Sequence, residues 1–213
     1  MQPTPEAHRG YSARFPENTL LAFQQAIAVG AKSMELDIHP SADGEFMVIH
    51  DARLERTTNG KGEVAKHSAA ELAKLDAGSW KNPAFAGERI PALEQVLALS
   101  QQNNVYCNIE IKSFTAELFD VKRLVALLHK YAPKDAKHML SSFDVQALLQ
   151  VKQYDSNIPL AIIGGDGYGM LAQALEHQIP WIHCHYSRVN HDLLLAAHAK
   201  GIRINAWTVN QPS

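Results

Sequence analysis

The chain has few cysteines, no long apolar run and almost no excess of charge. Only two of its 213 residues are cysteine, Cys107 and Cys184, and their spacing is not that of a metal-binding motif. Two such residues are typical of small buried side chains in a reducing compartment, with a disulfide between them as the alternative. We therefore expect buried thiols and no cysteine-ligated metal.

The charge balance and the length of the apolar runs bear on two further classes. Lys and Arg number 20 against 22 Asp and Glu, which leaves a formal net charge of -2 and no indication of broad nucleic-acid binding. No apolar run approaches the roughly 20 residues that span a bilayer. The N-terminal sequence lacks the basic and apolar regions of a signal peptide. We expect a cytoplasmic protein with no stable membrane insertion and no nucleic-acid partner; the sequence indicates no oligomeric state.

The clearest functional pattern lies in the stretch 33–39. Alternation along a strand places three apolar side chains on one face and Glu35, Asp37 and His39 on the other. Two carboxylates roughly 6.6 Å apart on one strand face are costly to bury without a cation. A surface-facing acidic edge is the alternative, but such strands seldom have so apolar a reverse face. The pattern favours a functional site.

The stretch 105–112 repeats this pattern, with an apolar face and an opposite face that carries Glu110 and Lys112. Both strands have acids near their carboxyl ends, which is where barrel strands carry a site. The sequence therefore predicts that Glu35, Asp37 and Glu110 together hold one hard divalent cation through oxygen ligands.

Apolar runs typical of strands alternate with amphipathic stretches typical of helices along most of the chain. Seven or so such units favour an α/β fold with parallel strands, closed into a TIM (β/α)8 barrel; an open doubly wound sheet is the alternative. The predicted strands cover residues 33–39, 46–49, 105–112, 139–143, 158–163, 181–184 and 202–207.

Local signals predict the boundaries of several elements. Asn18 is expected to cap the first helix, and Pro91 to occupy the first position of a later one. The run 46–49 has no polar alternation, which is typical of a strand buried on both faces. Periodicity weakens over about 52–89, which indicates a small subdomain inserted after the strand that His50 follows. We expect a single domain over residues 1–213.

Two histidines, His8 and His50, close expected strands, where a barrel carries its catalytic groups. A lone histidine there is more often structural. Acids, Arg9 and Lys112 nearby indicate a phosphate-ester site, because a metal, an arginine and a lysine neutralise the phosphate during transfer. One imidazole accepts a proton while the other donates one. His39 is expected at the barrel mouth as a solvated or substrate-rim residue, with metal ligation as the alternative, since Mg²⁺ and Ca²⁺ prefer oxygen.

Eight motifs follow one another along the chain. They are His8-Arg9-Gly10, Pro16-Glu17-Asn18-Thr19, Glu35-Leu36-Asp37, Asp43-Gly44, His50-Asp51, Arg56-Thr57-Thr58-Asn59-Gly60, Ile109-Glu110-Ile111-Lys112 and Trp207-Thr208-Val209-Asn210. Together they resemble the glycerophosphodiester phosphodiesterase family, and the stretch 76–80 is most similar to its bacterial cytoplasmic members. The resemblance implies a TIM barrel with an inserted subdomain that hydrolyses glycerophosphodiesters to sn-glycerol 3-phosphate and an alcohol.

The resemblance also implies roles for individual residues. The family's metal ligands correspond to Glu35, Asp37 and Glu110, its catalytic histidines to His8 and His50, and its phosphate and glycerol contacts to Arg9 and Lys112. We expect one divalent cation, Mg²⁺ first and Ca²⁺ second, and a small glycerophosphodiester as the partner. Trp207 ends a strand and is expected to line the substrate pocket, with core packing as the alternative.

Two features depart from the family pattern. Residues 2–6 are polar and proline-rich where the family has an apolar first strand. The chain stops at Ser213, just after the expected seventh strand, so the last β/α unit of a family barrel is expected to be missing. A lysophospholipase D-type activity and a catalytically silent phosphodiester-binding barrel are the alternatives. The presence of both histidines and all three acids disfavours the silent barrel.

Overall fold

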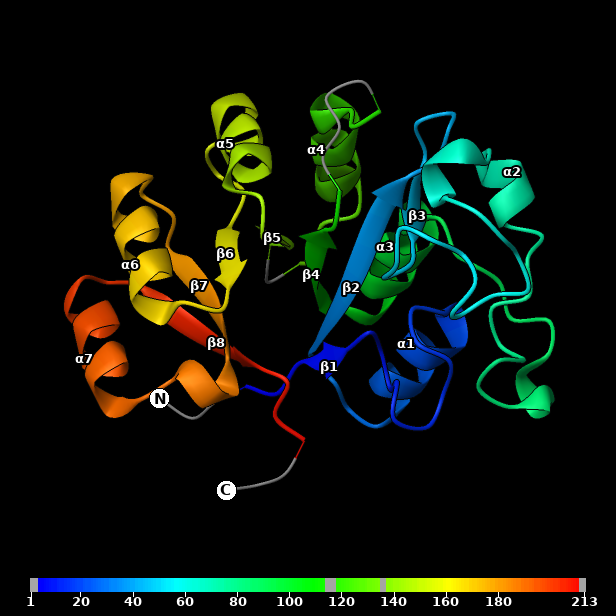
Figure 1. The fold of residues 1–213 in the computed structure, drawn as a ribbon, viewed down its shortest axis with the longest axis horizontal. Coiled ribbons are helices and arrows are strands. Elements are labelled where there is room, and N and C mark those ends of the chain that lie inside the picture. Colours follow the sequence, from blue (N-terminus) through cyan, green and yellow to red (C-terminus); the bar gives the residue numbers. More distant parts are fainter. Residues whose placement is uncertain (1–3, 114–117, 135–136, 211–213) are drawn as a thin grey trace. The chain divides into compact units, whose positions relative to one another are not determined.

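The structure is a computed structural model that describes residues 4–113, 118–134 and 137–210. The chain divides into two compact units, Met1–His138 and Met139–Ser213 (Figure 1). In each unit parallel strands alternate with helices along the chain, as the sequence predicts for an α/β protein. No helix within these described residues is long and apolar enough to cross a membrane.

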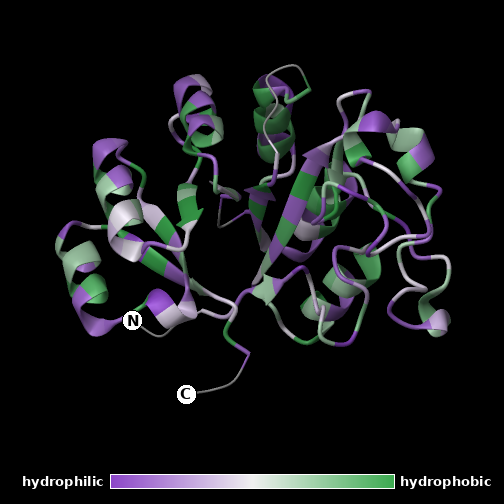
Figure 2. Cartoon of the chain, viewed as in Figure 1, coloured by the Kyte–Doolittle hydropathy of each residue, from purple (hydrophilic) through white to green (hydrophobic). Residues whose placement is uncertain are grey.

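The first unit contains a parallel sheet in the order β1-β2-β4, with β3 added antiparallel to β2. Its strands are β1 (Ala7–His8), β2 (Ser33–Pro40), β3 (Phe46–Val48) and β4 (Tyr106–Ile111). Every residue of β2 is buried, although the strand alternates between polar and apolar residues (Figure 2). The register pairs Glu35 with His8 of β1 and Asp37 with Glu110 of β4. Polar side chains from three strands therefore share one face.

The strand β3 differs from its predicted role. Its residues are buried, as the apolar run indicates, but it runs antiparallel to β2 and is not one of the parallel barrel strands. The connection from Pro40 to Phe46 holds only five residues, which suits a hairpin and is far too short for a parallel crossover. Gly44 has a positive φ of 78° within this turn. Apolarity predicted the burial, whereas connection length decides the strand direction.

The described residues of the first unit form four α-helices, and two of them begin at residues other than those predicted. They are α1 (Leu20–Ala28), α2 (Ala69–Leu72), α3 (Leu93–Asn103) and α4 (Val121–Lys130). Thr19 caps α1 by accepting a hydrogen bond from the Ala22 N–H, so the predicted cap at Asn18 is wrong. Pro91 lies two residues before α3, because its carbonyl oxygen accepts a hydrogen bond from Val48 of β3.

The predicted insertion contains α2 and two short 3-10 turns, Val64–Lys66 and Pro83–Phe85. Its apolar residues pack in one buried cluster with residues on either side of the segment. The cluster consists of Met47, Ile49, Leu54, Val64, Leu72, Ala77 and Ile90. The inserted segment therefore shares a hydrophobic core with β3 and with Ile90, which follows the segment. The single-domain organisation stays a prediction.

The second unit is a parallel sheet in the order β5-β6-β7-β8. Its elements are β5 (Met139–Ser142), α5 (Val145–Tyr154), β6 (Leu160–Gly164), α6 (Gly167–Glu176), β7 (Trp181–His185), a 3-10 turn (Tyr186–Arg188), α7 (His191–Ala199) and β8 (Arg203–Trp207). Asp144 and Asn190 cap α5 and α7 through their side chains. Cys184 in this unit and Cys107 in the first are both buried free thiols.

Candidate active site

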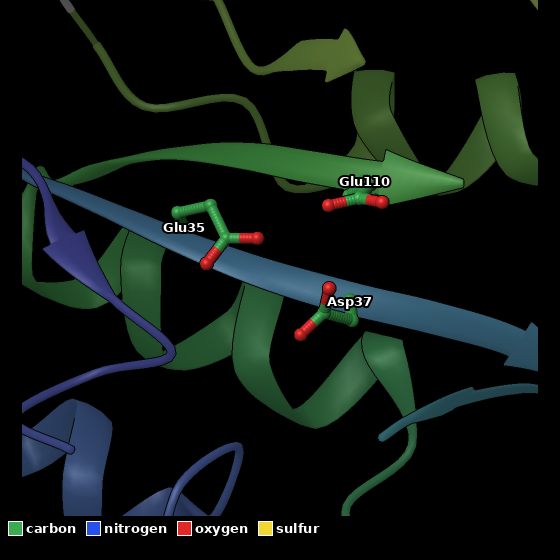
Figure 3. A group of neighbouring side chains, drawn as sticks. All are labelled: Glu35, Asp37 and Glu110. Atoms are coloured by element: carbon green, nitrogen blue, oxygen red, sulfur yellow. The ribbon is translucent and has the colours of Figure 1, made fainter. Parts of the chain in front are cut away.

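The three predicted acids lie together on one face of the first unit's sheet (Figure 3). Glu35 and Asp37 come from β2 and Glu110 from β4, and each offers an oxygen within 4.8 Å of the oxygens of the others. Because neighbouring strands are roughly 4.8 Å apart, the registered pair of Asp37 and Glu110 meets across the sheet. These three residues are called the acidic cluster below.

Burial and mutual repulsion disfavour the ionised form of the carboxyl groups in the acidic cluster. Burial raises the pKa of Glu35 well above its ordinary value, and the charges of Asp37 and Glu110 add to the effect. Burial, followed by the charge of Asp37, raises the pKa of Glu110. The Oδ1 atom of Asp37 is buried and has no hydrogen-bond partner among the described residues. An all-oxygen donor set of this kind fits a hard divalent cation, which would offset the repulsion.

Two cationic side chains approach the acidic cluster. Lys112 Nζ lies 2.7 Å from Glu110 Oε1 and 3.8 Å from Asp37 Oδ1. Arg9 Nε lies 3.2 Å from Asp37 Oδ2, as an ion pair without the alignment of a hydrogen bond. The backbone N–H of Arg9 donates to Glu35 Oε2 at 3.1 Å. Both predicted phosphate-contact residues therefore lie at the cluster.

A sharp turn after β1 positions Arg9 for these contacts. Arg9 and Gly10 both have positive φ, 56° and 77°. A Cβ atom at residue 10 would lie 2.7 Å from the carbonyl carbon of Ala22 in α1. Only glycine avoids both the backbone strain and the steric clash at this position, so Gly10 is required for the chain to pass so close to the helix.

The two predicted histidines also lie at this face. His8 Nε2 is 3.8 Å from Glu35 Oε2. Burial, followed by the nearby Arg9 charge, lowers the pKa of His8 to about 4, and His50 contributes to the same shift. His50 Nδ1 lies 2.6 Å from Asp51 Oδ1, and its Nε2 lies 3.2 Å from Lys112 Nζ. A proton on Nδ1, shared with Asp51, leaves the Nε2 lone pair facing the ammonium group of Lys112.

His39 does not lie at a solvated barrel mouth, and that prediction is wrong. It is 4% exposed. Its Nδ1 lies 2.6 Å from Ser113 Oγ, and its Nε2 lies 3.0 Å from the carbonyl oxygen of His50. Both ring nitrogens are thus committed to the protein, so His39 supports the segment that carries His50 and is not available as a metal ligand.

Four side chains that contact the candidate site were assigned no functional role from the sequence, although each belongs to a quoted motif. Asn18 Nδ2 donates to Asp37 Oδ2 at 2.8 Å from a loop before α1. Asp51 contacts His50, and Arg56 contacts both Asp51 and Glu17. A polar residue before a helix is ordinarily a cap, and the partner of an arginine in irregular chain cannot be identified from spacing.

Trp207 is the last residue of β8, in the second unit. Its indole Nε1 donates to the carbonyl oxygen of His183 at 3.1 Å. Its ring contacts those of Phe143 and His185, with centroid distances of 6.3 and 5.2 Å. Its role in substrate binding stays a prediction.

Comparison with known proteins identifies the family. The profile of the glycerophosphoryl diester phosphodiesterase family matches residues 8–213. A glycerophosphodiester phosphodiesterase of Caldanaerobacter subterraneus is 34% identical over 207 residues, which cover 96% of this chain and 85% of the relative. A glycerophosphodiester phosphodiesterase of Bacillus subtilis is 31% identical over 223 residues, which cover 96% of this chain and 75% of that protein.

Solved structures agree with this match. An Oleispira antarctica phosphodiesterase in complex with the product sn-glycerol-3-phosphate superimposes with a TM-score of 0.91 and 31% identity, covering 98% of this chain and 85% of that one. A glycerophosphodiester phosphodiesterase from Agrobacterium tumefaciens gives a TM-score of 0.83 at 26% identity, covering 97% and 87%. The resemblance, the TIM-barrel fold class and the enzyme class predicted from the sequence are thereby confirmed, and the chain belongs to the glycerophosphoryl diester phosphodiesterase family.

Proposed function

We propose that the chain hydrolyses glycerophosphodiesters to sn-glycerol 3-phosphate and an alcohol, with a divalent cation at the acidic cluster and with His8 and His50 as proton carriers. The observation that supports this most is three buried carboxylates beside two imidazoles and two cationic side chains. The product bound in the 31% identical Oleispira antarctica structure supports the choice of substrate.

Glu35, Asp37 and Glu110 would hold the cation, which supplies positive charge to a nonbridging phosphate oxygen and so makes the phosphorus more electrophilic. Mg²⁺ is the first choice and Ca²⁺ the second, because the donor set consists of carboxylate oxygens alone. Asp37 Oδ1 accepts no hydrogen bond from the described residues, and the pKa values of Glu35 and Glu110 are raised; both observations support a bound cation at this place.

The chain's own residues bind the phosphate and move the protons. Arg9 and Lys112 place two positive charges at the acidic cluster, where they neutralise a phosphodiester and the charge that develops during cleavage. One imidazole accepts the proton of the attacking hydroxyl, either from water or from the adjacent glycerol hydroxyl. The other protonates the leaving alcohol oxygen. Asp51 holds the Nδ1 side of His50, so that Nε2 is the atom that meets the substrate.

An assay of sn-glycerol 3-phosphate release tests the proposal. We expect release from glycerophosphocholine and glycerophosphoethanolamine in Mg²⁺, loss in chelator, and recovery when Mg²⁺ or Ca²⁺ is restored. His8→Ala and His50→Ala should each lower turnover by about 100-fold or more, the range of general acid–base catalysis. Rates close to the unsubstituted enzyme in either variant would refute the histidine pair.

Two further arms separate the alternatives. Lysophosphatidylcholine tests a lysophospholipase D-type activity, and preferential release of choline from it would displace glycerophosphodiesters as the substrate class. Calorimetry of glycerophosphocholine binding without product release would indicate a silent binding barrel. His191→Ala is the matched control, because that histidine lies at the start of α7 and its side chain is 83% exposed.

A further inference from the structure

Five side chains of the first unit form a continuous series of ion pairs that joins the two histidine-bearing segments; it is called the ion-pair chain below. Its members, in order of contact, are Arg9, Glu17, Arg56, Asp51 and His50. Arg9 Nη1 lies 3.0 Å from Glu17 Oε1 at one end, and His50 Nδ1 lies 2.6 Å from Asp51 Oδ1 at the other.

Arg56 occupies the centre of the ion-pair chain and contacts both carboxylates in bidentate fashion. Its Nη1 and Nη2 donate to the two oxygens of Glu17 at 3.1 and 2.9 Å. Its Nε and Nη2 donate to the two oxygens of Asp51 at 2.5 and 3.0 Å. A planar guanidinium with five N–H donors can span two carboxylates in this way, whereas the point charge of a lysine cannot.

The two carboxylates that Arg56 joins act on different catalytic groups. Asp51 fixes the Nδ1 atom of His50. Glu17 fixes the guanidinium of Arg9, whose Nε faces Asp37 of the acidic cluster. Among the described residues, Arg56 forms no hydrogen bond or ion pair with the acidic cluster itself. Its effect on the reaction must therefore pass through its two partners.

Arg56 comes from the inserted segment, which is attached to the β1–α1 loop at other points as well. The rings of Phe15 and Phe85 are 5.7 Å apart. Lys81 Nζ donates to the carbonyl oxygen of Ser12 at 2.5 Å. These contacts hold the insertion against the loop that carries Glu17, so that Arg56 lies within reach of Glu17.

We propose that Arg56 is a positioning residue for the proposed phosphodiester hydrolysis, and that the inserted segment takes part in catalysis through it. Arg56 holds Asp51 in the orientation that keeps the proton of His50 on Nδ1 and the lone pair on Nε2. The same guanidinium stops Glu17 from drawing Arg9 away from the phosphate position, because Glu17 shares its charge between two arginines. The inference rests on the proposed function.

The alternative is an ion pair that only attaches the insertion. Arg56 is 43% exposed at its side chain, and pairs of that kind often contribute little to stability. An attaching role would lower the unfolding midpoint and leave turnover and the His50 ring unchanged. A positioning role would change turnover and the His50 ring while the fold stays intact. Kinetics and nuclear magnetic resonance separate the two.

The test compares Arg56→Ala and Arg56→Lys with Arg53→Ala. Arg53 lies three positions earlier in the same segment, is 62% exposed and pairs only with Glu55 among the described ion pairs. We expect a loss of about 10- to 100-fold in kcat for Arg56→Ala, the range found when a supporting residue is removed. KM should change by less than about threefold on the same reasoning. The kcat of Arg56→Lys should be little higher than that of Arg56→Ala. Added guanidinium salt should restore part of the activity lost in Arg56→Ala.

A readout independent of turnover comes from the protein labelled with ¹⁵N-histidine. The Nδ1–H resonance of His50, assigned from its absence in His50→Gln, should move in Arg56→Ala and in Arg56→Lys and stay in Arg53→Ala. An unmoved resonance together with unchanged kcat would overturn the proposal. Equal losses in Arg56→Ala and Arg53→Ala would do the same. If the unsubstituted protein releases no sn-glycerol 3-phosphate, the proposed function fails, and the resonance still decides whether Arg56 positions His50. Should Arg56→Ala not fold, Arg56→Lys carries both measurements.

Discussion

The imidazole of His39 joins β2 to the backbone of His50: its Nε2 lies 3.0 Å from the His50 carbonyl oxygen, while its Nδ1 lies 2.6 Å from Ser113 Oγ. His50 follows β3, outside any regular element. A ring held on both sides by hydrogen bonds is rigid, and it transmits that rigidity to the segment it contacts. The position of a proposed catalytic histidine therefore depends on a second histidine, His39, that is only 4% exposed.

Replacing His39 should consequently affect both stability and turnover. His39→Ala leaves the His50 carbonyl and the Ser113 hydroxyl without a buried partner, and we expect a loss of about 1–3 kcal/mol in the free energy of unfolding. Turnover should fall with it, because the His50 backbone is released. His39→Asn, which retains a donor and an acceptor, should lose less of both. Urea titration and initial rates provide the measurements, and a His39→Ala protein as active as its parent would contradict this account.

Asn18 supports the acidic cluster from a strained backbone position, with a φ of 57° and its Nδ2 bonded to Asp37 Oδ2. Removing this hydrogen bond should weaken Mg²⁺ binding by about 10- to 100-fold, the usual effect of losing a group that orients a ligand. Asn18→Gly is the better substitution, because glycine accepts the positive φ and removes only the side chain.

Asn18→Ala and Asn18→Asp complete the series. Alanine should match glycine in Mg²⁺ affinity but cost about 1 kcal/mol more in stability, since its Cβ disfavours the left-handed conformation. Aspartate adds a fourth carboxylate beside the acidic cluster. Mg²⁺ affinity should fall if repulsion among the carboxylates outweighs the attraction of the new carboxylate for the cation, and should rise in the opposite case. Calorimetry distinguishes these outcomes; equal Mg²⁺ affinities across the parent, glycine and alanine proteins would show that Asn18 does not orient Asp37.

Alternation along β2 and β4 was enough to predict the acidic cluster, because the side-chain period of a strand is two and parallel neighbours in register bring equivalent faces together. The α/β class followed from the same alternation of strand and helix patterns. These predictions depend only on local periodicity. Arg9 and Lys112 could be predicted as positively charged neighbours of the cluster because they lie close in sequence to the acids and histidines.

What escaped prediction depends on contacts between distant parts of the chain. His39 contacts Ser113, 74 positions away, and Arg56 contacts Glu17, 39 positions away. Asn18 stands where a helix cap is expected, and only the neighbouring β2 turns its amide toward Asp37. The direction of β3 depends on connection length, which the apolar run itself does not encode.

Asp51 should make stability depend on acid pH. The hydrogen bonds from Arg56 are the largest cause that lowers the pKa of Asp51 to about 2 from its usual 3.8. A carboxyl group with a lowered pKa stabilises the folded protein above pH 3.8, and this contribution is lost as pH falls through about 2. The partly exposed pair should contribute about 1 kcal/mol after screening by solvent.

The measurement is the unfolding midpoint of the parent and of Asp51→Asn as a function of pH. The difference in unfolding midpoint between the parent and Asp51→Asn should be largest between pH 5 and 7 and should decrease below roughly pH 4. Asp192→Asn is the control, because the side chain of Asp192 is 86% exposed and should show no such trend. A difference between parent and Asp51→Asn that persists unchanged to the lowest accessible pH would exclude an ionised Asp51 as its source.

Gly10 and Gly44 allow the steric requirement of the β1 turn to be separated from backbone strain. Their φ angles are 77° and 78°, yet a Cβ at Gly10 would meet Ala22 at 2.7 Å, whereas nothing lies within 4 Å of a Cβ at Gly44. Gly44→Ala should therefore cost about 1 kcal/mol, the price of a left-handed alanine alone, and keep its activity. Gly10→Ala adds the clash with the α1 backbone, which displaces His8 and Arg9, so stability should fall by roughly 3 kcal/mol or more and turnover should be lost. Urea titration and activity assays of both variants provide the measurements. Equal losses in the free energy of unfolding would mean that the turn can move away from α1, and that the close approach is not what holds His8 at the acidic cluster.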